Sequence, residues 1–63
     1  MPVVQIDCWR GSSVHERART VKEVTEAVVR GIGCPAEAVT VIIREVDQSY
    51  WGRGGELARG TDI

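Results

Sequence analysis

The chain has 63 residues and a mass of 6.9 kDa, enough for a single domain spanning residues 1–63 with only a small core. Eight Lys and Arg residues against nine Asp and Glu residues give a formal charge of −1 without a basic run, which argues against a phosphate-backbone binder. No apolar stretch approaches the roughly 20 residues of a membrane span, and Asp7 and Arg10 interrupt any signal-peptide core. We therefore expect a cytoplasmic domain without nucleic-acid or membrane partners.

The cysteine and histidine content argues against a structural metal. Cys8 and Cys34 are the two cysteines, and with one histidine they cannot assemble a four-ligand zinc site of ordinary spacing. A disulfide between them is the alternative, but a small secreted scaffold usually carries several bridges. We expect two reduced thiols and no bound metal.

The first predicted element is a strand over residues 3–9. Its start is β-branched, and its side chains then alternate, with Val4, Ile6 and Cys8 on one face and Gln5, Asp7 and Trp9 on the other.

A long helix should follow. Ser13 and Glu16 have the spacing of a capping box, which predicts a helix start at Val14. Gly31, Gly33 and Pro35 predict its end near residues 30–32. The helical period places one stripe toward the core, formed by Val14, Ala18, Val21, Val24, Thr25, Val28 and Ile32. Charged residues occupy the opposite face, namely Glu16, Arg19, Glu23, Glu26 and Arg30.

Residues 39–46 predict a second strand, so the order is strand, helix, strand, with the two strands parallel and the crossover right-handed. One helix covers one face of two strands, and no element remains for the other face. The chain should therefore assemble through its sheet. The glycine-rich tail, residues 47–63, predicts a hairpin or loop that reaches onto a neighbour.

Pro2 is the first candidate for chemistry. Removal of the initiator Met would leave a secondary amine at the start of the first strand. A primary α-amine titrates near 7.7–8.0 and a secondary amine is more basic, but desolvation lowers the pKa toward the range of a general base. A chance Met-Pro start is the alternative interpretation.

Further residues strengthen this interpretation. These features are the Met1-Pro2 start, the order strand, turn, helix and strand, and the run Trp51-Gly52-Arg53-Gly54-Gly55-Glu56-Leu57. Through them the chain resembles the 4-oxalocrotonate tautomerase family throughout the length of the chain. The resemblance implies an α/β (α+β) fold, a small β-α-β protomer with parallel strands and a C-terminal hairpin or loop. It also implies sheet-paired dimers assembled into a hexamer, and cofactor-free proton transfer by an amino-terminal proline in an unsaturated 2-oxo or 2-hydroxy dicarboxylate.

The resemblance transfers unevenly to single residues. Pro2 matches the catalytic proline, and Trp51 matches the aromatic wall before the glycines. Ser12 and Thr40 stand where the family usually has two arginines that clamp the carboxylate and polarise the carbonyl, which a hydroxyl cannot do in the same way. The usual dicarboxylate clamp of the family is therefore missing at these two positions.

Other residues could replace the two missing arginines and line the substrate pocket. Arg53 and Trp9 stand where the family commonly has small apolar residues, and Arg44 shares the strand parity of Thr40. We expect a carboxylate site around Arg53, Trp51 and Ser12, with Trp9, Thr40 and Arg44 as further contacts. The alternatives are a solvated surface cation for Arg53 and interface packing for the two tryptophans.

Two other functions stay open. A protonated Pro2 could serve as the acid in hydrolytic chemistry on a 3-substituted acrylate, as in the dehalogenases and hydratases of the superfamily. Alternatively, the chain is a non-catalytic or half-catalytic subunit of a hetero-hexamer whose partner supplies the missing arginines. The leading prediction is a homo-hexameric tautomerase that acts on a small carboxylate.

Overall fold

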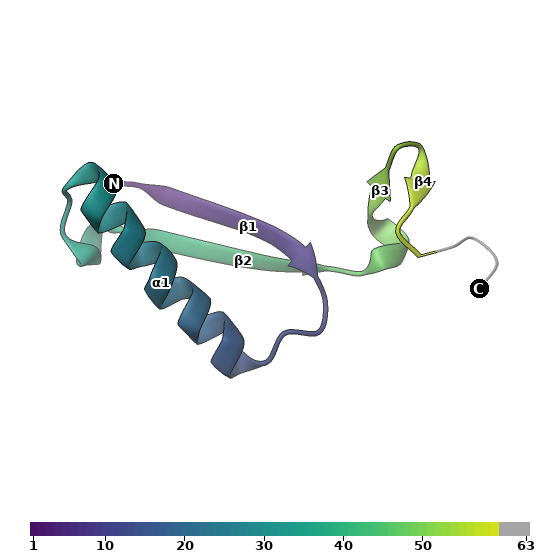
Figure 1. Cartoon of the computed structure of the whole chain (residues 1–63), viewed down its shortest axis with the longest axis horizontal. Helices are drawn as coiled ribbons and strands as arrows, with labels where there is room; N and C mark the ends of the chain where they lie inside the picture. Colours follow the sequence, from purple (N-terminus) through teal and green to yellow (C-terminus); the bar gives the residue numbers. More distant parts are fainter. Residues whose placement is uncertain (60–63) are drawn as a thin grey trace.

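The computed structural model describes residues 1–59 and has a β-α-β unit with a C-terminal hairpin (Figure 1). In chain order its elements are β1 (Val3–Trp9), α1 (Val14–Ile32), the short helix η1 (Ala36–Ala38), β2 (Thr40–Val46), the short helix η2 (Gln48–Tyr50), β3 (Gly52–Arg53) and β4 (Glu56–Leu57). The predicted fold class is thus confirmed. Residues 60–63 of the predicted tail lie outside the described residues.

Strands β1 and β2 pair in parallel, in a register that runs from Val3 opposite Thr40 to Trp9 opposite Val46. The predicted second strand began one residue too early, because the backbone N–H of Val39 donates to the Ala36 carbonyl at 3.1 Å and so closes η1. Half-buried and exposed residues alternate along β1, as predicted. The parallel register brings the carboxyl ends of both strands to the same end of the sheet.

Local chemistry sets both ends of α1. The Ser13 side chain accepts from the Glu16 backbone N–H at 3.1 Å, and the Glu16 carboxylate accepts from the Ser13 N–H at 2.8 Å, which is the predicted capping box. Gly33, at φ 84°, ends the helix in a left-handed conformation, and its N–H donates to the Val29 carbonyl at 2.9 Å. Within residues 1–59, no helix combines the length and apolar character needed to cross a membrane.

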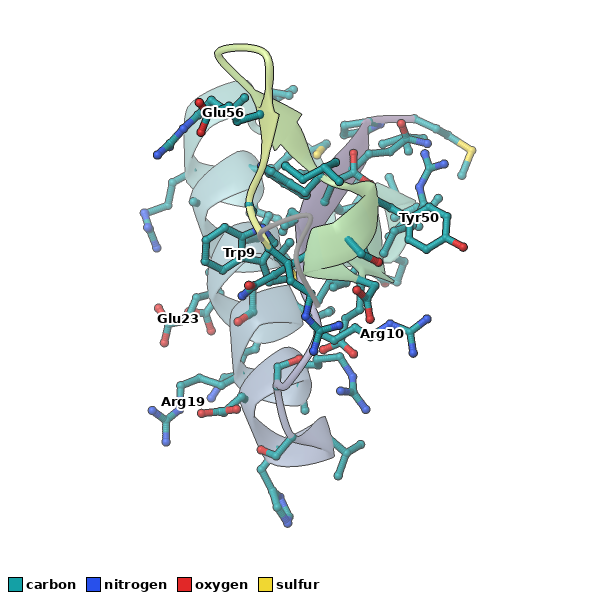
Figure 2. All side chains as sticks on the ribbon, turned by 90° about the vertical axis from the view of Figure 1, so that its right-hand side faces the viewer. Trp9, Arg10, Arg19, Glu23, Tyr50 and Glu56 are labelled. Carbon is teal, nitrogen blue, oxygen red and sulfur yellow. The ribbon has the colours of Figure 1, made fainter. Side chains whose placement is uncertain are left out.

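The apolar stripe of α1 is only partly covered. Val24, Thr25 and Val28 are half-buried, as predicted, but Val14 and Ile32 are 64% and 66% exposed. Ala18 and Val21 are exposed as well. For Val14 and Ala18 the reason is geometric, since α1 crosses the two strands at an angle and its first turns extend past their edge (Figure 1). On the other face, Arg19 and Glu23 project away from the strands, as predicted (Figure 2).

No residue within residues 1–59 is fully buried. The chain extends over 48 × 25 × 14 Å with a radius of gyration of 15.1 Å, whereas a compact domain of this length has about 11 Å. The sheet face away from α1 leaves Val3 and Trp9 59% and 47% exposed. A single copy of the chain therefore lacks a closed core.

The terminal hairpin depends on two glycines. Gly54 and Gly55 both have positive φ angles, 65° and 87°, as a two-residue turn between right-twisted strands requires. The Ala58 N–H donates to the Trp51 carbonyl at 2.8 Å, which holds the returning strand against the segment after η2. The predicted hairpin is thus present, and it extends past the carboxyl ends of β1 and β2 (Figure 1).

Candidate active site

Pro2 lies at the amino end of β1. Its carbonyl accepts from the Thr40 backbone N–H at 3.1 Å, so the parallel register brings these two predicted site residues together. Met1 is 94% exposed, whereas Pro2 is half-buried. Removal of Met1 therefore costs little packing, and it would leave the proline nitrogen at the open end of the sheet.

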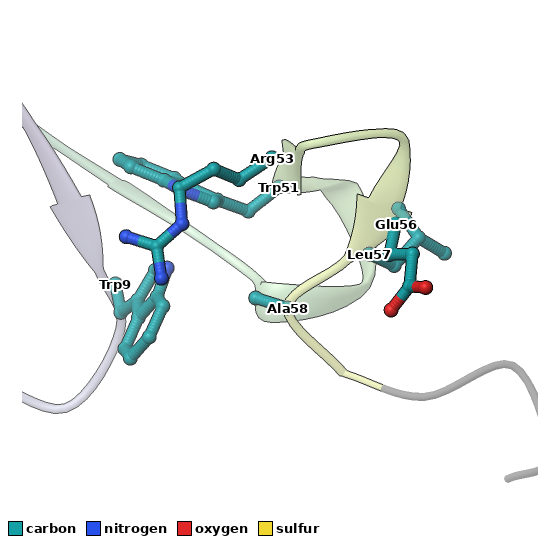
Figure 3. Close-up of a pocket in the computed structure, with 6 residues that line it drawn as sticks. All are labelled: Trp9, Trp51, Arg53, Glu56, Leu57 and Ala58. Atoms are coloured by element: carbon teal, nitrogen blue, oxygen red, sulfur yellow. The ribbon is translucent and has the colours of Figure 1, made fainter.

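A second group of predicted site residues forms a cleft at the opposite end of the sheet. Its volume is about 270 Å³. We call it the indole cleft, and it is lined by Trp9, Trp51, Arg53, Glu56, Leu57 and Ala58 (Figure 3). The Trp9 and Trp51 rings meet edge to face, with centroids 6.1 Å apart and planes at 81°. The structure thus brings three predicted substrate contacts together: Trp9, Trp51 and Arg53.

Arg53 is the one cation among the residues that line the indole cleft. None of the ion pairs within residues 1–59 involves it, whereas Arg17, Arg44 and Arg59 each pair with a carboxylate. Arg53 stands opposite Glu56 in the hairpin register, but its side chain extends toward the indoles while the Glu56 carboxylate points away from them (Figure 3). The guanidinium is therefore free to bind an anion.

Within one chain, Pro2 and the indole cleft are far apart. Pro2 precedes β1 and Trp9 is the last residue of this strand, so the two are seven positions apart along extended backbone. At about 3.3 Å per residue this is roughly 20 Å. A single chain therefore does not bring the Pro2 nitrogen to a ligand bound in the indole cleft.

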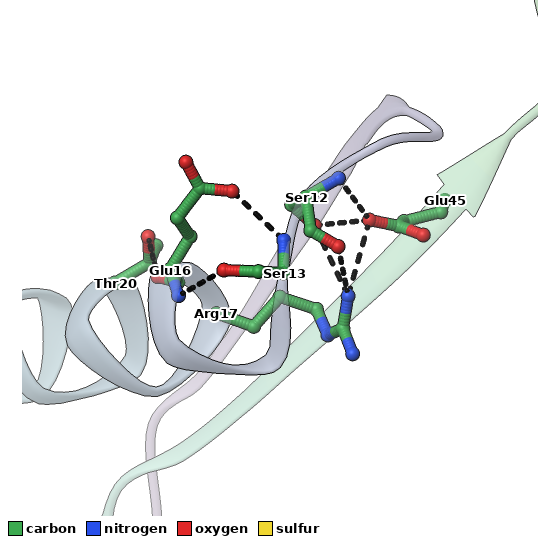
Figure 4. Close-up of polar contacts among 6 residues, drawn as sticks. All are labelled: Ser12, Ser13, Glu16, Arg17, Thr20 and Glu45. Carbon is green, nitrogen blue, oxygen red and sulfur yellow. Dashed lines mark hydrogen bonds and ion pairs between the residues drawn. The ribbon is translucent and has the colours of Figure 1, made fainter.

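Ser12 has a different environment, on the face of the sheet that α1 covers. Its backbone N–H donates to Oε2 of Glu45 at 3.2 Å, and its hydroxyl donates to the same oxygen (Figure 4). It lines a separate cavity of about 200 Å³ between the start of α1 and the strands. Its hydroxyl is thus engaged with Glu45, away from the indole cleft.

Arg17 is a residue that the sequence interpretation missed. Its Nη1 donates to the Ser12 carbonyl at 2.6 Å and lies 3.4 Å from Oε2 of Glu45 (Figure 4). A guanidinium therefore occupies the turn in which the family pattern has an arginine, although here it comes from the helix and Glu45 neutralises it. The signal was available, because helical side chains lean toward the N-terminus and a residue in the second turn covers the preceding loop.

Arg44 lies on the uncovered face of the sheet, opposite Asp7. Its Nε is 3.6 Å from Oδ1 of Asp7, and both side chains are more than half exposed. Arg44 does not line the indole cleft. Among residues 1–59, no cluster of three His, Cys, Asp or Glu side chains could hold a metal ion.

Acid is expected to weaken the Ser12, Arg17 and Glu45 cluster. The hydrogen bond from the Ser12 hydroxyl is the largest cause that lowers the pKa of Glu45 below its ordinary value of 4.5, and the Ser12 N–H and Arg17 lower it further. The folded chain thus binds this proton less readily than the unfolded chain. The stabilisation is complete above the ordinary pKa and is lost as the pH falls through the lower, folded-state pKa.

Chemical denaturation of the wild type and Glu45→Gln measures this effect. We expect Glu45→Gln to be less stable near neutral pH and the difference to close well below pH 4.5. Glu23→Gln, on the exposed face of α1, is the matched control. A stability difference that does not change with pH would contradict the assigned role of Glu45.

Comparison with known proteins identifies the family of this chain. The family model described as "Tautomerase enzyme" matches residues 2–59. A 2-hydroxymuconate tautomerase of Pseudomonas putida is 40% identical over 58 residues, which cover 92% of each chain.

Two solved structures share the fold. A 4-oxalocrotonate tautomerase homologue from the tomaymycin biosynthetic pathway superposes with a TM-score of 0.87 at 32% identity, covering 90% of this chain and 88% of that one. A hetero-hexameric 4-oxalocrotonate tautomerase from Chloroflexus aurantiacus superposes with a TM-score of 0.86 at 26% identity, covering 92% and 94% of the two chains. On these matches, together with the β-α-β protomer and its glycine hairpin, this chain belongs to the tautomerase family.

Proposed function

We propose that this protein is a cofactor-independent tautomerase that moves a proton in an unsaturated 2-oxo or 2-hydroxy carboxylate. The observation that carries the proposal is the family match, which begins at residue 2 and extends through the hairpin. The Pseudomonas putida relative, named a 2-hydroxymuconate tautomerase, supports this class of substrate. In the proposal, Met1 is removed and Pro2 carries the chemistry.

The proton transfer needs one basic nitrogen near the substrate. The Pro2 amine accepts the proton of the 2-hydroxyl group, and the π electrons move along the conjugated chain as the carbonyl forms. The resulting ammonium returns a proton to a carbon of that chain, so the amine is regenerated and nothing else is consumed. Arg53 holds the substrate carboxylate during both steps.

The separation of Pro2 from the indole cleft requires a site shared between copies in this proposal. We place the indole cleft of one copy beside Pro2 of another, so that an assembly completes what one protomer lacks. The exposed apolar side chains on the uncovered face of the sheet and along α1 support assembly, because their burial supplies the missing core. The proposed assembly is a homo-hexamer.

Sedimentation equilibrium tests the assembly. At micromolar concentration we expect a single species close to six times the 6.9 kDa chain mass, because two strands and one helix leave apolar surface that only other copies can cover. Circular dichroism on the same sample checks that the chain is folded. A folded monomer of 6.9 kDa at this concentration contradicts the prediction.

A hetero-hexameric subunit is the second candidate. Two observations favour it: Ser12 and Thr40 stand at the positions of the two family arginines, and one solved structure with this fold is a hetero-hexamer. This candidate predicts that the purified chain is inactive alone and gains activity when mixed with a related chain that carries both arginines.

The proposed activity is tested on protein whose intact mass shows that Met1 is absent. Its ability to convert a 2-hydroxydienoate into the 2-oxo form is followed by the loss of dienol absorbance. A rate well above the buffer reaction supports the proposal. A rate equal to the buffer reaction, with the hexamer intact and no partner chain, overturns it.

A further inference from the structure

The lining of the indole cleft combines one free cation with two flat aromatic faces. Trp9 comes from the end of β1, Trp51 follows η2, and Arg53 belongs to β3, so three segments converge there. The volume of about 270 Å³ lies close to the lower end of small-molecule sites, about 300 Å³. The cleft is thus sized for a small organic acid.

Its charge fits one carboxylate. Arg53 is the one cation in the lining, and no ion pair within residues 1–59 uses it. A guanidinium binds a carboxylate through two parallel hydrogen bonds. A second carboxylate on the same ligand would meet an indole, Leu57 or the like charge of Glu56, so it would lose hydration without gaining a cation.

Apart from Glu56, whose carboxylate points away from the indoles (Figure 3), the rest of the lining fits a flat, uncharged group. An indole presents a large π face, and aromatic or conjugated ligand groups pack on such a face in offset or edge-to-face geometry. Trp9 and Trp51 stand at an interplanar angle of 81°, so one planar ligand can contact the face of one ring and the edge of the other. Leu57 and Ala58 add apolar surface beside them.

We propose that the indole cleft selects planar, conjugated carboxylates with a single negative charge, of the aryl-substituted or unsaturated 2-oxo acid class, over dicarboxylates. The substrate part of this inference rests on the proposed function, whereas the binding preference does not. Arg53 pairs with the one carboxylate, and Trp9 and Trp51 hold the planar remainder.

Binding of unreactive probes tests the preference without any turnover. Cinnamate is a planar monocarboxylate, trans,trans-muconate is a planar dicarboxylate, and 3-phenylpropionate is a flexible monocarboxylate. Titration calorimetry gives their affinities, and tryptophan emission reports on the site directly because the chain has two tryptophans and both line the cleft. We expect cinnamate to bind at least tenfold more tightly than muconate and several-fold more tightly than 3-phenylpropionate.

Two variants assign the preference to residues. Arg53→Ala should weaken cinnamate binding at least tenfold, while Arg19→Ala, an arginine on the exposed face of α1, should leave it unchanged. Trp9→Leu keeps an apolar side chain in the cleft but removes the planar aromatic face. The ratio of cinnamate affinity to 3-phenylpropionate affinity should therefore fall toward one. Circular dichroism and sedimentation confirm that each variant is folded and assembled.

Muconate binding that equals or exceeds cinnamate binding overturns the inference, as does unchanged cinnamate affinity in Arg53→Ala. Loss of turnover in Met1-free protein with the binding preference intact would instead contradict the proposed function alone. Turnover of a dicarboxylate in preference to a monocarboxylate, with Pro2 active, would contradict the inference alone.

Discussion

Protein that keeps Met1 is expected to show no tautomerase activity above the buffer reaction. With Met1 attached, the nitrogen of Pro2 belongs to a peptide bond, and its lone pair is delocalised into the carbonyl. It cannot accept a proton at neutral pH, whatever the rest of the site provides. General acid and base groups typically contribute 10²–10⁴-fold to the rate, so a loss on that order or larger should follow.

The experiment compares two preparations of the same sequence. One is processed to begin at Pro2 and the other retains Met1, and intact mass identifies each of them. Sedimentation of both preparations checks that the assembly is unchanged, which we expect because Met1 is 94% exposed. Equal turnover by the two preparations, above the buffer reaction, would refute the amino-terminal proline mechanism.

Pro2→Ala tests how much of the activity depends on the proline ring and how much on a free amine alone. After Met1 removal this variant has a primary amine, which still acts as a base, so a strongly reduced but residual rate is expected. Pro35→Ala changes the chain's other proline, which precedes η1, and serves as the control.

Arg53→Ala is expected to raise KM for a carboxylate substrate by about 10- to 150-fold. A hydrogen bond to a charged group contributes about 1.5–3 kcal/mol, and each 1.4 kcal/mol is a factor of ten in affinity. If Arg53 binds the carboxylate equally in the ground state and the transition state, kcat changes little while KM rises. Steady-state kinetics on Met1-free protein separates the two constants.

Arg53→Lys and Arg19→Ala are the controls for this prediction. Lysine keeps the charge but lacks the planar fork, so an intermediate KM is expected. Arg19 projects away from the strands, and its loss should leave the kinetics unchanged (Figure 2). Kinetics of Arg53→Ala that match the wild type would identify Arg53 as a solvated surface cation.

The sequence by itself determined the elements and most of their ends, because these depend on chemistry within a few residues. The capping box of Ser13 and Glu16 starts α1, and Gly33 ends it. Alternation defined β1, and the Gly54-Gly55 pair defined a hairpin whose turn needs two positive φ angles. The strand start at Thr40 was missed by one residue, since a short helix includes Val39 in its last hydrogen bond.

The tertiary structure decided which candidate residues share a site. Ser12 binds Glu45, 33 residues away, and the Arg17 guanidinium joins them, so the hydroxyl that the sequence offered to a substrate is engaged on the helix side of the sheet. The pattern of residues within a short segment cannot predict the contact of Ser12 with Glu45, because this contact depends on how α1 lies across the strands.

The parallel register decided the rest. It places Pro2 and Thr40 at one end of the sheet, and it brings the segment after Val46 beside Trp9 at the other end. The chain turn at η2 then returns Trp51 and Arg53 toward Trp9, which forms the indole cleft. The residue types in the sequence were enough to propose the candidate residues. Only the direction and register of the two strands showed that Pro2 lies far from the indole cleft, because the seven residues of β1 are extended and cannot fold back.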